Sequence, residues 1–470
     1  MDLRIRKAVT RFGAKLVVGG AQPTALDGGA SERLLCRPGG EEAMLRALQK
    51  AMLDASSQAG SPADGEAGGA EAAAAAKVLP GQEELTRMLG GTSLDELAGR
   101  AGLEALDVRD AAGLLVGAES IVIIWGERTA PGALVDLALL AGVDHGETSG
   151  LIEVPSGTNA RGLREVGCLP NMAPGLESVA EDQGTDGKPK ALYLLHSDPV
   201  RELPDRKSWE DALTKASFIV AHDQFVTESL ERHADVVFPS ESYAEKEGTV
   251  THPDGRLQRL RPAIGHPGEV RMEWQTLVEL GRRLGLDLPH LTAGMIWQEI
   301  AERVPFYDGI TLDEIGGDGL RWQDRDTSAA AAREALGELR FSSPSMPQAA
   351  AEPSNGSLAL STTPDLWASW ECERSPALDF LAAEQELRLH PSDAERLGVA
   401  AGETVDVASN GDAVRAVVRL RDGAKPGTAL LILGTRSENA NVLANGAPAM
   451  VEVRKERPPA AKPADGFQAR

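Results

Sequence analysis

The residues best suited to bind a ligand follow two short apolar runs in the middle of the chain. Asp223 ends the first run, Thr227 and Glu228 come soon after it, and Gly248 and Thr249 follow the second. Residues beyond the carboxyl ends of parallel strands line the crevice where open α/β sheets bind ligands. A purely structural interpretation is that Thr227 and Glu228 begin a helix and Gly248 makes a turn. Either way, the pattern predicts that these residues lie at one edge of a sheet.

The chain lacks the patterns of a self-contained metal site or nucleophile. Its three cysteines, Cys36, Cys168 and Cys372, lie far apart and form no Cys-x-x-Cys pair. The eight histidines form no His-x-x-x-His or His-Glu-x-x-His set. A Gly-x-Ser-x-Gly elbow is absent, and Gly19-Gly20 lacks the Gly-x-Gly-x-x-Gly spacing. We therefore predict no metal ligand and no catalytic residue, and we expect Cys168 to be a buried thiol.

Composition argues against several classes of protein. The 71 acidic and 48 basic residues give a formal net charge of −23, which repels the phosphates of nucleic acids and anionic lipids. No stretch approaches the roughly 20 apolar residues of a membrane-spanning helix, and the N-terminus lacks the apolar segment of a secretory signal. We expect a cytoplasmic protein that neither binds nucleic acid nor inserts into a membrane. Its 470 residues predict two or three domains.

The first part of the chain has the pattern of an incomplete Rossmann-like unit. A basic helix at 3–12, an apolar run at 14–20 and a helix at 40–55 form the α-β-α remainder of such a unit, without its first strand. We assign residues 1–57 to this partial domain. Residues 58–80 are mostly Ala, Gly, Ser, Glu and Asp, which cannot bury enough apolar area to offset the entropy of ordering. This segment is predicted to be a flexible, low-complexity insertion.

Residues 81–323 are predicted to form a doubly wound α/β domain. Apolar runs at 120–126, 190–196, 218–223 and 234–239 alternate with helical patterns, which is typical of a parallel sheet. The unbroken run at 120–126 indicates a strand covered on both faces. After a linker at 324–356, short strands with Asn-Gly and Pro-Gly turns predict a small β-barrel at 357–457. A disordered tail is expected at 458–470.

The stretch from Asp223 closely resembles the molybdopterin oxidoreductase superfamily. It reads Asp-Gln-Phe-Val-Thr-Glu-Ser, then Ala-Asp-Val-Val-Phe-Pro, then Ala-Glu-Lys-Glu-Gly-Thr and Gly-Arg-Leu-Gln, and several irregular loop positions agree in order. The resemblance implies that Asp223 recognises guanosine and ribose and that Gly248 and Thr249 pack against a pterin. Together with Thr227 and Glu228, these are then vestigial molybdopterin-site positions.

Two departures from the family pattern concern the backbone near the ligand. His196-Ser-Asp-Pro stands where relatives have Gly-Glu-Asn-Pro, and Thr251-His-Pro-Asp-Gly-Arg stands where many have Thr-Asn-x-Glu-Gly-Arg. The first replaces a glycine that allows backbone to approach a phosphate closely. The second replaces an amide with an imidazole and removes an N–H donor.

Further resemblance covers most of the chain. The pattern Asn159, Gly162, Gly167 and Pro170, followed by Met-Ala-Pro-Gly, is most similar to the G subunit of NADH-quinone oxidoreductase, respiratory complex I. The stretch from His390 to Ser409 resembles the dinucleotide-binding C-terminal barrel, a double-psi β-barrel. The family carries molybdopterin guanine dinucleotide and iron–sulfur clusters. Because its cluster cysteines and metal ligand precede the region matched here, we expect no cofactor within this chain.

Three alternative functions remain open, the first two implied by the resemblance and the third by the missing first strand. The first is a scaffold subunit that contacts other subunits of the complex I peripheral arm, at the inner face of the plasma membrane. The second is the cofactor-covering half of a split, molybdopterin-dependent oxidoreductase of the formate dehydrogenase type. The third is a truncated product without a function of its own. Only the second predicts a companion polypeptide with a four-cysteine cluster and a Ser, Cys or selenocysteine metal ligand.

Overall fold

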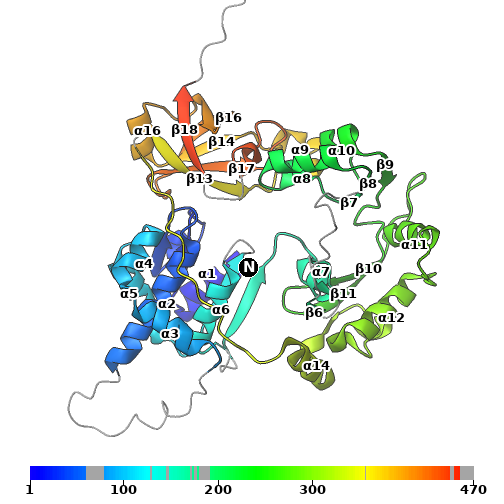
Figure 1. Cartoon of the computed structure of the whole chain (residues 1–470), viewed down its shortest axis with the longest axis horizontal. Coiled ribbons are helices and arrows are strands. Elements are labelled where there is room, and N and C mark those ends of the chain that lie inside the picture. Colours follow the sequence, from blue (N-terminus) through cyan, green and yellow to red (C-terminus); the bar gives the residue numbers. More distant parts are fainter. Residues whose placement is uncertain are drawn as a thin grey trace, which may run out of the picture.

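The computed structural model describes residues 1–59, 79–126, 130–143, 148–169, 172–173, 177–178, 191–354, 356–444 and 449–455. The predicted insertion at 58–80 and the predicted tail at 458–470 lie almost wholly outside the described residues, as does Pro170. None of the described helices is long and apolar enough to cross a membrane. The chain is mixed α/β with small parallel sheets and a closed β-barrel (Figure 1).

The N-terminal unit surrounds one long helix. Its elements are α1 (Asp2–Phe12), β1 (Val17–Gly20), β2 (Glu32–Leu35), α2 (Glu41–Ala59), α3 (Gln82–Gly90), α4 (Leu94–Ala101), α5 (Ala105–Val116), β3 (Val122–Gly126), α6 (Pro131–Leu140) and β4 (Gly150–Val154). β1 pairs with β2, and β3 with β4, both in parallel. The helices predicted at 3–12 and 40–55 are confirmed as α1 and α2.

The core of this unit does not divide at the predicted boundary between 1–57 and 81–323. A single cluster of buried side chains runs from Leu34 through α2 to Leu137. On α2, all seven residues from Ala43 to Gln49 are buried, five of them apolar, so the helix needs partners on several sides. Helices α4, α5 and α6 supply them. Burial of a helix that is apolar around most of its circumference therefore joins the two predicted domains.

The pair β3–β4 corrects one prediction. The strand at 120–126 is parallel as predicted, but Val122 is 53% and Val154 46% exposed. Ile123 and Trp125 face the core on the opposite side of the pleat. Within the described part of the chain, only one face of this two-stranded sheet is covered. The prediction of a strand buried on both faces is wrong, because an apolar run does not show how many layers pack against it.

A third parallel sheet, in the order β7-β8-β9, forms the sheet unit. Its elements are β7 (Leu192–Leu195), α8 (Pro199–Glu202), α9 (Arg206–Lys215), β8 (Ile219–Asp223), α10 (Glu228–His233) and β9 (Val236–Pro239). Leu213 and Ile219 are buried in its small core. The three strands predicted at 190–239 are thereby confirmed as neighbours in one sheet.

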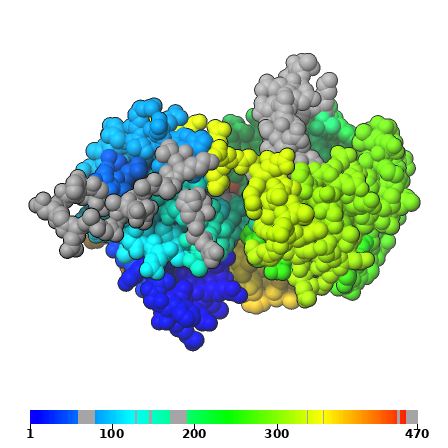
Figure 2. Space-filling view, turned by 90° about the horizontal axis from the view of Figure 1, so that it is seen from below, coloured from blue at the N-terminus to red at the C-terminus, as the bar shows by residue number. Residues whose placement is uncertain are grey.

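A mostly helical unit follows, together with a short antiparallel sheet. It contains α7 (Ala160–Glu165), β5 (Met172–Ala173), β6 (Glu177–Ser178), β10 (Gly248–Thr251), β11 (Arg256–Leu260), α11 (Glu273–Arg283), α12 (Ala293–Arg303), α13 (Leu312–Ile315), β12 (Leu320–Arg321) and α14 (Asp326–Leu336). Trp297, Phe306, Tyr307 and Trp322 form its aromatic core. Seen from below in Figure 2, this unit (green to yellow) lies beside the N-terminal unit (blue to cyan).

The predicted linker at 324–356 is not a free spacer. After α14, the strap formed by residues 337–356 runs extended along the N-terminal unit towards the barrel (yellow in Figure 1). Phe341 is buried in the core of that unit, and its N–H donates to the Pro80 carbonyl at 2.9 Å. The N–H of Ala350 donates to the Arg100 carbonyl at 2.8 Å. Composition suggested a spacer because it does not show these long-range contacts.

The C-terminal barrel is closed, with the strand order β13-β17-β14-β16-β15-β18. Its elements are β13 (Ser357–Pro364), α15 (Trp370–Arg374), β14 (Glu386–Leu389), α16 (Pro391–Leu397), β15 (Thr404–Ser409), β16 (Asp412–Leu420), β17 (Thr428–Leu433) and β18 (Met450–Lys455). The pairs β13–β17 and β14–β16 are parallel. Alternate apolar residues such as Val405 and Val407 fill its interior. The predicted barrel is confirmed.

One buried ion pair fixes the strap to the N-terminal core. Arg46 on α2 donates to Asp136 on α6 at 2.6 Å, and both side chains are almost completely buried. Ser342 of the strap donates its N–H and its hydroxyl to the same carboxylate, at 2.7 and 2.5 Å. Removing one member of such a pair leaves the other buried without its partner, which is strongly destabilising.

We predict that Asp136→Ala lowers the free energy of unfolding by about 3–5 kcal/mol, because it leaves the Arg46 guanidinium buried and unpaired. As a matched control, Asp54→Ala removes a partly exposed i,i+4 pair with Lys50 and should cost about 0.3–0.5 kcal/mol. Urea-induced unfolding of both variants measures the difference. Equal losses would show that the buried pair does not anchor the strap.

Candidate functional site

The carboxyl ends of β7, β8 and β9 lie at the same edge of one parallel sheet. Asp198 follows β7 and is the N-cap of the short helix α8, where its side chain accepts a hydrogen bond from the N–H of Arg201. Asp223 ends β8, and one of its oxygens accepts from the N–H of Phe225. The Asp223 carbonyl accepts from the N–H of Ser240, just beyond β9. This edge is where an open parallel sheet binds ligands.

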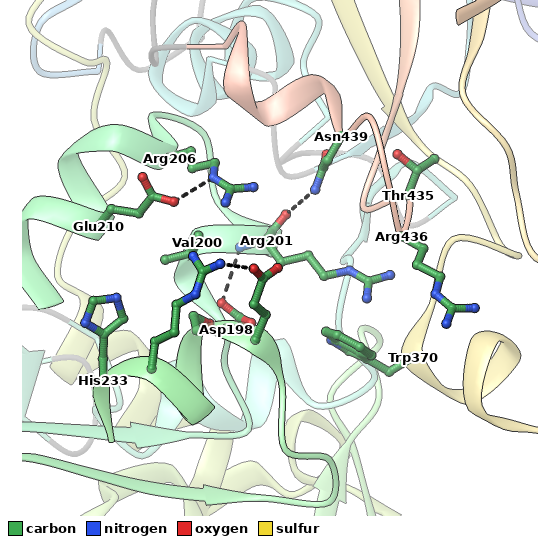
Figure 3. Close-up of a pocket in the computed structure, with 13 residues that line it drawn as sticks. Asp198, Val200, Arg201, Arg206, Glu210, His233, Trp370, Thr435, Arg436 and Asn439 are labelled. Atoms are coloured by element: carbon green, nitrogen blue, oxygen red, sulfur yellow. Dashed lines mark hydrogen bonds and ion pairs between the residues drawn. The ribbon is translucent and has the colours of Figure 1, made fainter. Parts of the chain in front are cut away.

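A small polar cavity, which we call the seam pocket, lies between this sheet unit and the barrel (Figure 3). Its volume is about 80 Å³. Its walls come from α8, α9 and α10 on one side and from α15 and the loop after β17 on the other. The lining residues are Asp198, Val200, Arg201, Arg206, Glu210, Glu228, Ser229, Arg232, His233, Trp370, Thr435, Arg436 and Asn439.

Arg201 joins the two walls of the seam pocket. Its guanidinium donates to both oxygens of Glu373, at 2.6 and 3.1 Å, and its Cζ lies 3.8 Å from the centre of the Trp370 ring. It also donates to the Gly434 carbonyl at 2.6 Å. The Arg201 side chain is 12% and that of Glu373 2% exposed. This is a buried, bidentate ion pair, the strongest geometry for an arginine and a carboxylate.

Two asparagines of the barrel complete this contact. Asn439 donates from Nδ2 to the Arg201 carbonyl at 2.9 Å, as Figure 3 shows, and Asn441 donates to the Val200 carbonyl. Both lie in or beside the 3₁₀ turn Ala440–Val442 and are buried. The carbonyls of α8 that have no partner within this short helix thus accept hydrogen bonds from side chains in a distant part of the chain. These bonds fix the barrel against the sheet unit.

The remaining charges around the seam pocket are unevenly paired. Arg206 binds Glu210 at 2.8 Å, and Arg232 binds Glu228 one helical turn away. Arg436, by contrast, lies 3.9 Å from Asp379 with both side chains exposed, a pair of little energetic value. The Arg436 guanidinium is therefore readily available to an anionic ligand.

A carboxyl group beside the pocket has an unusual affinity for protons. Burial, and then the nearby carboxylates of Asp198 and Asp223, raise the pKa of Glu202 to about 7. A partly protonated Glu202 reduces the negative charge at the strand ends, where an anionic ligand would otherwise be repelled.

The structure brings three of the five predicted site residues together. Glu228 lines the seam pocket, Thr227 is buried beside it as the N-cap of α10, and Asp223 ends the adjacent strand. Gly248 and Thr249 lie elsewhere, in β10, where they pair with Leu260 and Arg259. The predicted helix cap at Thr227 is confirmed, whereas the predicted turn at Gly248 is wrong, because this glycine takes part in an antiparallel ladder.

A second polar cluster lies at the same sheet edge and joins residues that follow β7 and β9. His196, Ser240 and Lys246 all contact the carboxylate of Glu273, the first residue of α11; Lys246 lies 2.9 Å from it. Ser240 and His196 are also 2.8 Å apart. His196 has a φ of 48°, in the left-handed region that glycine favours. The histidine that replaces the family's glycine therefore keeps a glycine-like backbone, held by contacts of its side chain.

Several functional residues were missed at the level of sequence. Arg201, Trp370 and Arg436 lie in three distant segments, and no local pattern marks them. Two motifs pointed here: the one that begins at His196 places Asp198 after β7, and the one that begins at Asp223 places Glu228 in the wall of the pocket. Cys168 was expected to be buried but is exposed, because it lies in a loop beyond the end of α7. Among the described residues, no three His, Cys, Asp or Glu side chains form a metal-binding group.

Two family models match the chain. The model described as molybdopterin oxidoreductase matches residues 41–283, and the model of the molybdopterin dinucleotide binding domain matches residues 362–454. They support the superfamily but not the G subunit in particular. The expectation that this chain carries no cofactor is not supported, because both matched regions suggest a cofactor-binding site.

Several characterised proteins are similar to this chain. The NADPH-Fe(3+) oxidoreductase subunit alpha of Geobacter sulfurreducens is 30% identical over 97% of the chain and 54% of its own length. The F420-dependent formate dehydrogenase subunit alpha of Methanocaldococcus jannaschii is 27% identical over 67% of the chain and 52% of its own length. Formate dehydrogenase H of Escherichia coli is 25% identical, over 53% and 40%. The chain thus spans about half the length of these relatives.

A solved structure shares the fold. Acetylene hydratase from Pelobacter acetylenicus matches 97% of this chain and 75% of its own with a TM-score of 0.66. The sequence identity is 15%, so this likeness concerns the fold alone. It shows that the same arrangement of small sheets and a barrel occurs within another solved protein.

The Glu273 cluster predicts a specific dependence of stability on pH. Burial alone would raise the pKa of Glu273, but hydrogen bonds from His196, Ser240 and Lys246 lower it to about 2. A carboxyl group with a depressed pKa stabilises the fold above its ordinary pKa, and this contribution is lost as the pH falls towards 2. Between pH 5 and pH 3, the wild-type chain should therefore lose more stability than Glu273→Gln.

Urea-unfolding midpoints at the two pH values measure this loss. Glu269→Gln, a change at an exposed carboxylate a few residues before α11, serves as the control and should behave like the wild type. If Glu273→Gln and the wild type lost the same stability on acidification, the cluster would not hold an ionised Glu273.

Proposed function

Since the chain belongs to the molybdopterin oxidoreductase family, we propose that it is the cofactor-covering half of a molybdopterin-dependent oxidoreductase of the formate dehydrogenase type. A companion polypeptide would supply the iron–sulfur cluster and the metal ligand. The names of the relatives, an NADPH-Fe(3+) oxidoreductase and several formate dehydrogenases, support this function more than they support a complex I scaffold.

One observation carries the proposal: the seam pocket is built from both matched regions. Asp198 to His233 belong to the region that matches the oxidoreductase model, and Trp370 to Asn439 belong to the region that matches the dinucleotide-binding model. A ligand that must contact both regions at once would find polar walls from each of them in this pocket. A scaffold role requires no such convergence of arginines on a cavity.

The residues present suit part of a dinucleotide. Arg436, Arg206 and Arg232 are arginines of the kind that bind phosphate oxygens, and Thr435 adds a hydroxyl. Sites for whole cofactors usually measure roughly 300–1,000 Å³. A cavity of about 80 Å³ accommodates a phosphate-sized group, so the other parts of the cofactor would extend along the strand ends near Asp223. When bound, the cofactor would supply two-electron redox chemistry at its metal.

The rival function is a scaffold in the peripheral arm of NADH-quinone oxidoreductase, where the partners would be other subunits of that arm. It assigns no role to Arg436 or to the other pocket arginines. The two functions are therefore distinguished by what the chain carries when it is isolated gently from its own host.

We predict that the tagged chain co-purifies with pterin and with a cluster-bearing polypeptide. Arg436→Ala should lower the pterin retained per chain by about tenfold, because it removes the cation that is least engaged by protein carboxylates. Pterin is measured by the fluorescence of its oxidation product, and the partners by mass spectrometry. The control Arg421→Ala, at an exposed site after β16, should retain pterin as the wild type does.

Recovery of NADH dehydrogenase and quinone-module subunits without pterin would reject the proposal in favour of the scaffold role. Equal pterin retention by Arg436→Ala and the wild type would leave the cofactor but remove the seam pocket as its site.

A further inference from the structure

The N-terminal unit carries two separate sheets on one layer of helices. β1 and β2 form one parallel pair, and β3 and β4 form another. Val17 of β1 and Ile123 and Trp125 of β3 all pack against the single core that surrounds α2. A sheet of only two strands is marginally stable by itself, and parallel sheets occur almost only where both faces are covered. Each pair therefore resembles a fragment of a wider sheet.

The distribution of charge along the four strands shows which edges are suited to a further strand. β2 carries Glu32 and Arg33, and β4 carries Glu153. β1 and β3 read Val-Val-Gly-Gly and Val-Ile-Ile-Trp-Gly, without a charged residue or a proline. Proteins protect exposed edge strands with such residues or with bulges. Among the described strands, β1 pairs only with β2 and β3 only with β4, so β1 and β3 each have an unprotected free edge.

The outer face of the β3–β4 pair is an apolar surface. Val122, Ile124, Ile152 and Val154 lie on this face, because residues that are register partners in a parallel pair share one face. These β-branched side chains are typical of buried strands, yet Val122, Ile124 and Val154 are between 37% and 53% exposed. A contiguous exposed apolar surface of this kind marks an interaction site.

The relatives of this chain contain much additional polypeptide that could supply the neighbouring strands. The chain spans 54% of the length of its Geobacter sulfurreducens relative. It also covers only 75% of the acetylene hydratase chain that shares its fold. Both proteins thus contain segments that have no counterpart here. The companion polypeptide of the proposed function is the occupant that would provide them.

A second copy of this chain fits the free edge of β1 poorly. Helix α1 leads into β1 and presents Arg4, Lys7 and Arg11 at positions i, i+3 and i+7, all of them exposed. A symmetric dimer brings the same patch of both subunits together, so a dimer across β1 would bring two such basic stripes close to each other. Like charges across an interface oppose association. A different polypeptide, with acidic residues beside its strand, meets no such repulsion.

We infer that strands of the companion polypeptide pair with the free edges of β1 and β3 and that its side chains cover the outer face of β3–β4. The inference rests on the proposed function, because that function requires the companion, and it names the surface of this chain that binds it. Strand addition of this kind gains affinity from main-chain hydrogen bonds and specificity from the side chains on the face of the sheet.

We predict that the double variant Val122→Lys/Val154→Lys, isolated as the full tagged chain from its own host, retains at least about tenfold less of the cluster-bearing polypeptide than the wild type does. The reason is that a partner on this face would have to desolvate two ammonium groups. Retention is measured by quantitative mass spectrometry relative to the tagged chain. Leu284→Lys is the matched control: this apolar residue just past α11 is 74% exposed, and the variant should retain the companion as the wild type does.

Hydrogen exchange of the wild-type chain gives a second test that needs no variant. In the complex, the backbone amides of β1 and β3 should exchange at least about tenfold more slowly than in the chain separated from its companion, because strands with paired edges open less readily. The amides of β15, which lies within the closed barrel, should exchange alike in both states.

Equal retention by the double variant and Leu284→Lys, or unchanged exchange of β1 and β3, would overturn the inference while the proposed function stands. A wild-type chain that retains no cluster-bearing polypeptide would overturn both. A dimer of the isolated chain, seen by light scattering and abolished by the double variant, would assign the face to a second copy and overturn the inference as well. Should the double variant not fold, the exchange measurement decides.

Discussion

The buried ion pair between Arg201 and Glu373 is the interaction on which the arrangement of the molecule depends. Taking two charges out of water is costly, and the cost is recovered only when geometry is good and the remaining hydrogen-bonding atoms are satisfied. Here both carboxylate oxygens accept, the Trp370 ring covers the guanidinium, and Gly434 takes a further donor. Such an arrangement tolerates only one position of the barrel, which defines the walls of the seam pocket.

Arg46 and Asp136 form a second buried ion pair, which lies in the N-terminal unit. Its carboxylate is satisfied by α2 on one side and by Ser342 of the strap on the other. The strap leads directly into β13, so the path of the chain into the barrel is set by a contact inside the N-terminal core. Two buried carboxylates thus hold the barrel: Asp136 through the strap that leads into it, and Glu373 through the face that meets α8.

The strand ends of the sheet unit show how the residues at a ligand-binding edge can change while the fold stays the same. His196 takes a left-handed backbone conformation that costs about 1–3 kcal/mol in a residue with a side chain. Its contacts with Ser240 and Glu273 offset that cost. The imidazole stands near the place where a glycine would leave backbone open to a phosphate, so any cofactor at this edge must meet a different surface from that of its relatives.

The sequence by itself determined the local elements and the family. Three patterns reflect constraints between neighbouring residues: the 3.6-residue apolar pattern of α2, the alternation of strands and helices, and the loop motif from Asp223. Such local patterns can be recognised in the sequence alone. The helix cap at Thr227 and the barrel were predictable for the same reason. The exposure of one face of β3 was not predictable, because an apolar run shows which side chains a strand can bury but not which elements cover them.

Only the tertiary structure decided which residues meet at the seam. Arg201, Trp370, Glu373 and Arg436 are separated by more than two hundred positions between first and last, and their contacts arise when the barrel meets α8. Gly248 lies outside this set, because backbone pairing with Leu260 places it in an antiparallel ladder and not in the lining of the seam pocket. The residues that meet at the seam are determined by the burial of charged side chains from distant segments, and no local pattern in the sequence encodes that burial.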